Sequence, residues 1–164
     1  MFISVHLRMD RHQINIGVAL MISELLQIEN IQIIESVNDW KEGVYVSLKP
    51  LLDSGSITQH YIDTVIRLTE QHGAYYMLLP EVALLHARPE DGVCHMKMSI
   101  TLLKKPVLFQ GKTIPTKLLI GLAATDSSSH LDALGSLSEV LSSQERMEQV
   151  YAAKTCRDMY NLFI

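Results

Sequence analysis

The sequence predicts a single α/β domain in which helices flank a mixed central β-sheet. Short apolar runs typical of buried strands alternate with longer segments whose apolar residues recur every three to four positions. No proline-, glycine- or serine-rich linker and no internal repeat divides the chain. Its 164 residues are enough to enclose one sizeable hydrophobic core.

The first half of the chain predicts two amphipathic helices after a short helix (21–27) and a short strand (31–34). One helix runs through residues 39–55, where Pro50 removes a backbone donor near the last turn, so we expect a kink or an early end. The other, over residues 58–71, has a threonine cap and a glycine stop. The apolar faces are expected to hold Trp40, Val44, Leu48, Leu51 and Leu52 in the first helix and Tyr61, Ile62, Val65, Ile66 and Thr69 in the second.

The strands and helices of the second half follow from the same patterns. Residues 75–79 (YYMLL) predict a buried strand, and residues 82–85 (VALL) predict a second apolar run. Residues 96–103 alternate between apolar side chains on one face and lysine, serine and threonine on the other. Residues 117–124 predict a strand buried on both faces. Helices are expected over 127–143, 144–153 and 156–163, the first with Leu131, Leu134, Leu137 and Leu141 facing inward.

Charge and composition exclude several classes of function. A formal net charge of −4 argues against nonspecific nucleic-acid binding, which needs a basic face. No apolar run reaches the roughly 18–20 residues that span a bilayer. Cys94 and Cys156 form no CxxC pair, so we expect ordinary thiols in a reduced, cytoplasmic protein. No glycine-rich phosphate loop or dinucleotide fingerprint is present, so no nucleotide cofactor is expected.

Residues 1–20 are interpreted as an N-terminal extension ahead of a domain that spans residues 21–164. Two arginines precede the apolar run at 14–22, as in a signal peptide, but an asparagine and a glycine interrupt the run and no cleavage site follows. We therefore expect no secretion. Met21 begins MISELL and offers an alternative start for the chain.

The stretch ALLHARPEDG, residues 83–92, brings a histidine out of an apolar segment and into an acidic turn. A neutral imidazole has a nucleophilic nitrogen near pH 7, so His86 is a candidate phosphoryl acceptor. A phosphohistidine needs nearby donors to offset its charge. Arg88 offers a planar fork to phosphate oxygens, and His130, at the start of a predicted helix, offers a ring N–H.

The start of that helix is itself a candidate anion site. A strand, a polar loop and a helix N-terminus together present free backbone N–H groups, and the helix dipole favours negative charge. The hydroxyl donors there are Ser127, Ser128 and Ser129. We take Ser128 and Ser129, with Arg88, as the candidate phosphate-binding residues.

Residue chemistry alone leaves other interpretations open. His86 and Arg88 also fit a solvated loop, and His130 also fits a packing or capping role. Cys94 and His95 with His86 suggest a metal site, but their spacing matches no standard zinc pattern, so no metal is expected. Cys94 has no base at motif spacing and is treated as an ordinary thiol.

The chain resembles the enzyme IIA components of the bacterial sugar phosphotransferase system, of the mannitol/fructose type, with the ascorbate-like and galactitol-like branches nearest. The resemblance runs from about residue 21 to about residue 153. It includes NDWKEGVYVSLKPLLDSGSITQHYIDTVI, HARPEDGV, SITLLKKPVLF and LLIGLAATDSSSHLDALGSLSEVLSS. The combination of these segments is specific, whereas HAR alone is weak.

The resemblance implies a phosphocarrier with a mixed sheet flanked by helices and no required metal or nucleotide. The matching acceptor is His86, which takes a phosphoryl group from the phosphorylated histidine-containing carrier protein. The matching second histidine is His130, which helps hold that group. The group then passes to a cysteine of enzyme IIB, and the protein meets the membrane component IIC only through IIB. A regulatory module on the same scaffold, acting by protein binding, is the alternative. The sugar and the oligomeric state are not written in the sequence.

Two departures from the family pattern affect the site. Members usually carry proline before the acceptor histidine, where this chain has Leu85, and its absence is expected to loosen the loop. Some mannitol-type members have an arginine at the end of the preceding helix. Here Thr69 or Glu70 falls at that place and Arg67 lies about one turn earlier, so Arg88 is the candidate substitute.

Overall fold

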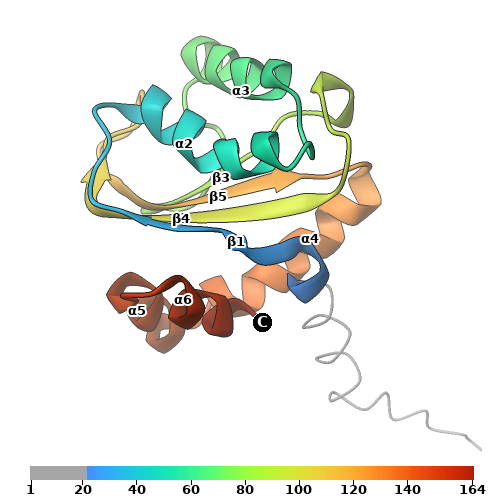
Figure 1. The fold of residues 1–164 in the computed structure, drawn as a ribbon. Helices are drawn as coiled ribbons and strands as arrows, with labels where there is room; N and C mark the ends of the chain where they lie inside the picture. The colour runs from blue at the N-terminus through green and yellow to red at the C-terminus, as the bar shows by residue number, and fades with distance from the viewer. Residues whose placement is uncertain (1–21) are drawn as a thin grey trace, which may run out of the picture.

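The computed structural model describes residues 22–164, so the predicted extension over residues 1–20 lies outside the described residues. Five strands form one mixed sheet in the order β1-β4-β5-β3-β2 (Figure 1). β1 pairs in parallel with β4 and β3 with β5, whereas the β4–β5 and β2–β3 pairs are antiparallel. The strands are β1 (Leu26–Ile34), β2 (Met77–Leu79), β3 (Val82–Leu85), β4 (Lys97–Val107) and β5 (Thr116–Ala123).

Helices cover both faces of the sheet, which confirms the predicted class (Figure 1). α2 (Trp40–Asp53) and α3 (Gln59–His72) lie on one face. α4 (Ser127–Leu141), α5 (Gln144–Ala152) and α6 (Cys156–Phe163) lie on the other. Residues 22–25, just before β1, are helical, as predicted, whereas residues 26–27 of the predicted helix already belong to β1, because the strand pairs with β4 from Leu26 onward.

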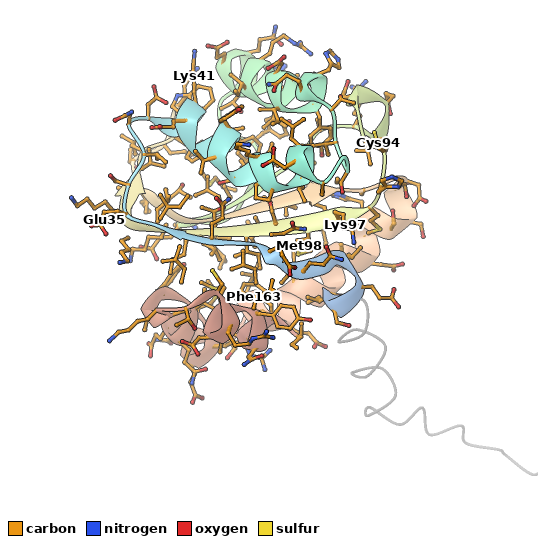
Figure 2. All side chains as sticks on the ribbon, viewed as in Figure 1. Glu35, Lys41, Cys94, Lys97, Met98 and Phe163 are labelled. Carbon is orange, nitrogen blue, oxygen red and sulfur yellow. The ribbon has the colours of Figure 1, made fainter. Side chains whose placement is uncertain are left out.

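The two layers enclose two apolar clusters, one on each face of the sheet. Alternate residues of each strand enter one or the other: Leu84 of β3 faces the α4–α6 layer, and Leu85 faces the α2–α3 layer. Figure 2 shows the side chains between the layers and labels Met98 and Phe163, which belong to the α4–α6 cluster. The central strands are therefore buried on both faces.

Because β4 is buried on both faces, its alternation of apolar and polar residues does not mark one face as exposed to water. Ser99 and Thr101 occupy the polar positions of the pattern, yet both side chains are fully buried. The Ser99 hydroxyl donates to the Ser47 carbonyl at 2.7 Å, and Gln32 Nε2 reaches the Thr101 hydroxyl at 3.3 Å. Because each hydroxyl has a partner, the polar face packs beneath α2 without facing water.

Pro50 does not shorten α2, which continues to Asp53. A proline has no N–H for the carbonyl four residues before it, here that of Val46. Gln32 Nε2 donates to this carbonyl at 2.9 Å from the neighbouring strand β1. The side chain of another element thus replaces the lost helical bond.

Two predictions of burial are wrong, one for a single residue and one for a strand. Leu131 is 65% exposed, because the buried face of α4 contains Ala133, and two residues of helix place Leu131 roughly 200° around the axis from it. The strand predicted as buried over residues 75–79 forms only β2, which pairs with β3 alone. As an edge strand it leaves Leu78 and Leu79 more than one-third exposed.

Gly121 of β5 sits where no side chain fits. A Cβ added there would lie 2.4 Å from the Ser99 hydroxyl and 2.8 Å from Leu48 Cδ2. We expect Gly121→Ala to lower the free energy of unfolding by about 1–3 kcal/mol, as overpacking does, in urea titrations. Gly135→Ala in α4 is the control, because nothing lies within 4 Å of its Cβ position; it should be neutral or stabilising. Equal stability of the Gly121→Ala and wild-type proteins would contradict the packing argument.

Candidate functional site

The candidate site begins where β3 ends. Leu85, the last residue of β3, is fully buried and pairs with Gly121 of β5, so His86 is the first residue outside the sheet. The chain then turns through a short 3-10 helix, Pro89–Asp91. The Arg88 backbone N–H donates to the Asp91 carboxylate at 3.0 Å and closes this turn.

Hydrogen bonds tie the far side of the loop to the start of α3. The Thr58 backbone N–H donates to the Gly92 carbonyl at 2.9 Å, and the N–H groups of Cys94 and His95 both donate to the Ser56 carbonyl. Gly92 has a φ of 129°, which L-residues rarely adopt, and a Cβ there would lie 2.1 Å from the Thr58 hydroxyl. The loop after His86 is therefore held to the helix layer and has a fixed course.

The His86 imidazole is oriented by its own strand. Its Nδ1 lies 2.8 Å from the Leu84 carbonyl oxygen. A carbonyl oxygen can only accept, so Nδ1 carries the proton of the neutral ring, and Nε2 keeps a free lone pair. The rings of Tyr75 and Tyr76 flank the imidazole at centroid distances of 6.1 and 6.5 Å. The half-buried ring thus presents a nucleophilic nitrogen in one direction.

His130 lies against His86, as the sequence predicts for two residues of one site. The ring centroids are 5.1 Å apart, with 44° between the ring planes. Partial burial and the positive charge of a protonated His86 lower the pKa of His130 below its usual value of about 6.5. His130 is therefore neutral near pH 7, and a neutral imidazole still offers one N–H donor.

Arg88 and His72 share a surface pocket with His86. The pocket has a volume of about 440 Å³ and is lined by Leu68, His72, Tyr75, His86, Ala87 and Arg88. Arg88 is exposed, so its guanidinium can turn toward an anion in this pocket. Both basic side chains border the same pocket as the candidate nucleophile.

The residues of α3 considered for the missing arginine are engaged elsewhere. The Thr69 hydroxyl is buried and bonded to the Tyr76 hydroxyl at 2.6 Å, and Glu70 pairs with Lys41. Arg67 lies 3.5 Å from Gln71 on the exposed face of the helix. The residue of α3 that borders the pocket as a basic group is His72, which the sequence argument had not considered.

The serines at the start of α4 already have partners within a helix cap. The Ser129 backbone N–H donates to the Asp126 carboxylate at 2.7 Å, and the Ser129 hydroxyl donates to the Asp126 carbonyl at 3.0 Å. Hydrogen bonds from the Ser129 backbone and side chain to the Asp126 carboxyl lower the pKa of that carboxyl, and the Ser128 backbone lowers it further. A phosphate at this helix end has to displace an anionic cap. Anion binding by Ser128 and Ser129 thus stays a prediction.

Tyr61 contacts the loop that follows His86, whereas sequence analysis assigned it only to the core. Its ring is fully buried in α3, and its hydroxyl accepts from the Ala87 N–H at 2.9 Å and donates to the Leu122 carbonyl at 2.6 Å. The available signal was a tyrosine in an apolar stripe, since a buried tyrosine hydroxyl needs a partner. The identity of the partner depends on the fold.

The other candidate groups do not gather into a site within the described residues. Cys94 is an exposed free thiol, and within residues 22–164 no three histidine, cysteine or acidic side chains gather as a metal site would require. In the same part of the chain no helix combines the length and apolar character needed to cross a bilayer.

Comparisons with known proteins agree with this geometry. The family model described as phosphoenolpyruvate-dependent sugar phosphotransferase system, EIIA 2 matches residues 24–164. The mannitol-specific cryptic phosphotransferase enzyme IIA component of Escherichia coli K12 is 40% identical over 141 residues, covering 86% of this chain and 96% of that protein. The ascorbate-specific EIIA component of Mycoplasma pneumoniae is 29% identical, over 85% of this chain and 86% of its own.

Solved structures show the same fold. The solution structure of the E. coli mannitol-specific cryptic enzyme IIA has a TM-score of 0.82 at 39% identity, covering 87% of this chain and 97% of that chain. E. coli enzyme IIA mannitol, solved in complex with phosphorylated enzyme IIB, has a TM-score of 0.72 over 84% of this chain and 96% of its own, at 19% identity. The chain therefore belongs to the EIIA 2 family of the phosphoenolpyruvate-dependent sugar phosphotransferase system.

Proposed function

We propose that this EIIA component is a phosphocarrier that takes a phosphoryl group on Nε2 of His86 from the phosphorylated histidine-containing carrier protein. It then passes the group to a cysteine of enzyme IIB during sugar uptake. The observation that carries this proposal is the bond from His86 Nδ1 to the Leu84 carbonyl, which leaves Nε2 as the nucleophile, 5.1 Å ring to ring from His130.

In each transfer step one bond to phosphorus forms as another breaks, and neither step needs a metal or a nucleotide. The Nε2 lone pair attacks phosphorus as the P–N bond to the carrier's histidine breaks, and the carrier's imidazole recovers its lone pair. The Nδ1 proton stays on His86, where the Leu84 carbonyl stabilises the positive charge of the phosphorylated ring. A thiolate of IIB then attacks phosphorus, and the electrons of the broken P–N bond return to Nε2.

His130 and Arg88 are proposed to hold the phosphoryl oxygens. A neutral His130 donates its remaining N–H without adding a charge to His86, and Arg88 offers a bidentate fork from the pocket. Ser128 and Ser129 are further candidate donors if the Asp126 cap opens. The role places the protein in the cytoplasm, where it reaches the membrane transporter only through IIB.

Intact-protein mass tests this proposal. The protein is incubated with phosphoenolpyruvate, enzyme I and the histidine-containing carrier, and we expect one acid-labile phosphoryl group per chain. An unmodified or an acid-stable product would contradict a phosphohistidine carrier. Addition of candidate IIB proteins then separates transport from regulation, because a regulatory module would keep its phosphoryl group in the presence of every IIB.

Phosphorylation of His86 should raise the pKa of His130. In the unmodified protein, partial burial lowers the pKa of His130, and His86 lowers it further when it is protonated. A phosphoryl group gives His86 a net negative charge and so favours the protonated form of the His130 ring. NMR titration of the His130 ring protons should show a higher pKa in the phosphorylated protein. The same or a lower pKa would argue against contact between His130 and the phosphoryl group.

A further inference from the structure

The peptide group that follows His86 is held from both ends by tyrosine hydroxyls. Its N–H, from Ala87, donates to the Tyr61 hydroxyl at 2.9 Å. Its carbonyl oxygen, from His86, accepts from the Tyr75 hydroxyl at 3.4 Å. The two tyrosines come from different places, Tyr61 from the first turn of α3 and Tyr75 from the segment between α3 and β2. The peptide plane beside the candidate acceptor is therefore fixed by groups outside its own loop.

Tyr61 also joins the loop to the strand that leads to His130. Its hydroxyl proton goes to the Leu122 carbonyl at 2.6 Å, because a carbonyl can only accept, and its oxygen lone pair receives the Ala87 N–H. Leu122 lies near the end of β5, and the chain passes from β5 to the start of α4, which carries His130. The Tyr61 hydroxyl thus connects the loop of His86 to β5, the strand that precedes the helix of His130.

Burial makes the Tyr61 bonds stronger constraints than the Tyr75 bond. The Tyr61 side chain is fully buried, whereas Tyr75 is 47% exposed and its bond is long. Burial raises the pKa of Tyr61, so its hydroxyl keeps its proton at physiological pH. Water cannot readily replace a bond at a buried hydroxyl, so losing the Tyr61 hydroxyl removes a hydrogen bond from both the Ala87 N–H and the Leu122 carbonyl.

We infer that Tyr61 is a positioning residue for phosphoryl transfer at His86. Tyr75 makes the second and weaker hydrogen bond to the same peptide group. The inference rests on the proposed function of His86 as the acceptor. We expect that freeing this peptide group lets the backbone at His86 shift, which would carry the imidazole away from the Leu84 carbonyl and redirect Nε2. Displacements of about 1 Å at a reacting group can cost up to about a hundredfold in rate.

Tyr61→Phe tests this inference, because it removes the hydroxyl and keeps the ring. The matched control is Tyr151→Phe in α5, next to Glu81 at the opposite end of β3 from His86. Two readouts are compared: the His86 imidazole ¹⁵N shifts, which report the Nδ1–H tautomer without any phosphorylation, and the single-turnover rate of phosphorylation at saturating carrier. The first stays informative even if the chain proves not to accept phosphate.

We expect Tyr61→Phe to lower the Nδ1–H tautomer fraction of His86 and to slow phosphorylation at saturating carrier by at least about tenfold, with little change in apparent affinity. Tyr151→Phe should match wild type in both readouts. Wild-type tautomer and rate in Tyr61→Phe would overturn the inference. A wild type that is not phosphorylated would overturn the proposed function instead, while the tautomer comparison still tests Tyr61.

A measurement on the wild-type protein covers the case in which Tyr61→Phe fails to fold. The Ala87 amide should exchange with deuterium as slowly as the amides of β5, because its partner is a buried hydroxyl. Exchange at the rate of an exposed loop amide would overturn the positioning role without any variant.

Discussion

Alanine in place of His86 is expected to abolish phosphorylation by the phosphorylated histidine-containing carrier. The substitution removes Nε2, the nitrogen that the Nδ1–Leu84 bond leaves with a free lone pair. We do not expect His130 to serve instead, because no hydrogen bond within residues 22–164 fixes which of its ring nitrogens carries the proton, as the Leu84 carbonyl does for His86. We expect no detectable acid-labile adduct by intact mass over the time in which wild type is fully labelled.

His60→Ala is the matched control for this substitution. His60 is an exposed histidine in the first turn of α3, and its ring contacts the Thr64 hydroxyl on the same helix. The control should be labelled to the wild-type extent. Because His86 is only half-buried, its loss should leave urea unfolding close to wild type, which separates chemistry from folding. Full labelling of a folded His86→Ala protein would move the acceptor to another residue.

The helices were the most predictable part of the fold, because their signals are local. The periodic stripe and the terminal glycines locate α2 and α3 to within a few residues of the observed Trp40–Asp53 and Gln59–His72. β1 was predicted only over residues 31–34, yet it extends back to Leu26 through the polar residues Gln27 and Glu29. That extension depends on pairing with β4, which a single stretch of sequence does not reveal.

The site was predictable only in part, for a similar reason. His86 and His130 stand out because each follows an apolar strand segment at a point where the chain turns outward. Tyr61 and His72 do not stand out, because their roles depend on which loop α3 packs against. Leu85 was expected to loosen the loop, but it is buried in β3, and hydrogen bonds hold the residues after it. An effect of Leu85 on phosphoryl transfer stays a prediction.

Alanine in place of His130 is expected to slow phosphoryl donation to IIB while leaving acceptance from the carrier protein intact. The variant should still accept a phosphoryl group to completion, because the bond that prepares Nε2 of His86 runs to Leu84 and not to His130. Onward transfer to IIB should fall by about a hundredfold, the typical cost of losing one donor to a developing negative charge. The difference arises because a neutral imidazole leaves in the first step, whereas an anionic thiolate approaches the charged phosphoryl group in the second.

His130→Gln provides the comparison that isolates the donor. A glutamine amide can donate to a phosphoryl oxygen but does not titrate, so it should restore part of the lost rate and remove any pH dependence that comes from His130. The measurement is single-turnover transfer from the isolated phosphorylated variant to IIB, at several pH values. Undiminished transfer by His130→Ala would remove the role for His130. Equal loss in the alanine and glutamine variants would indicate that the His130 ring acts by packing against His86 and not as a donor, because the centroids of the two rings lie 5.1 Å apart.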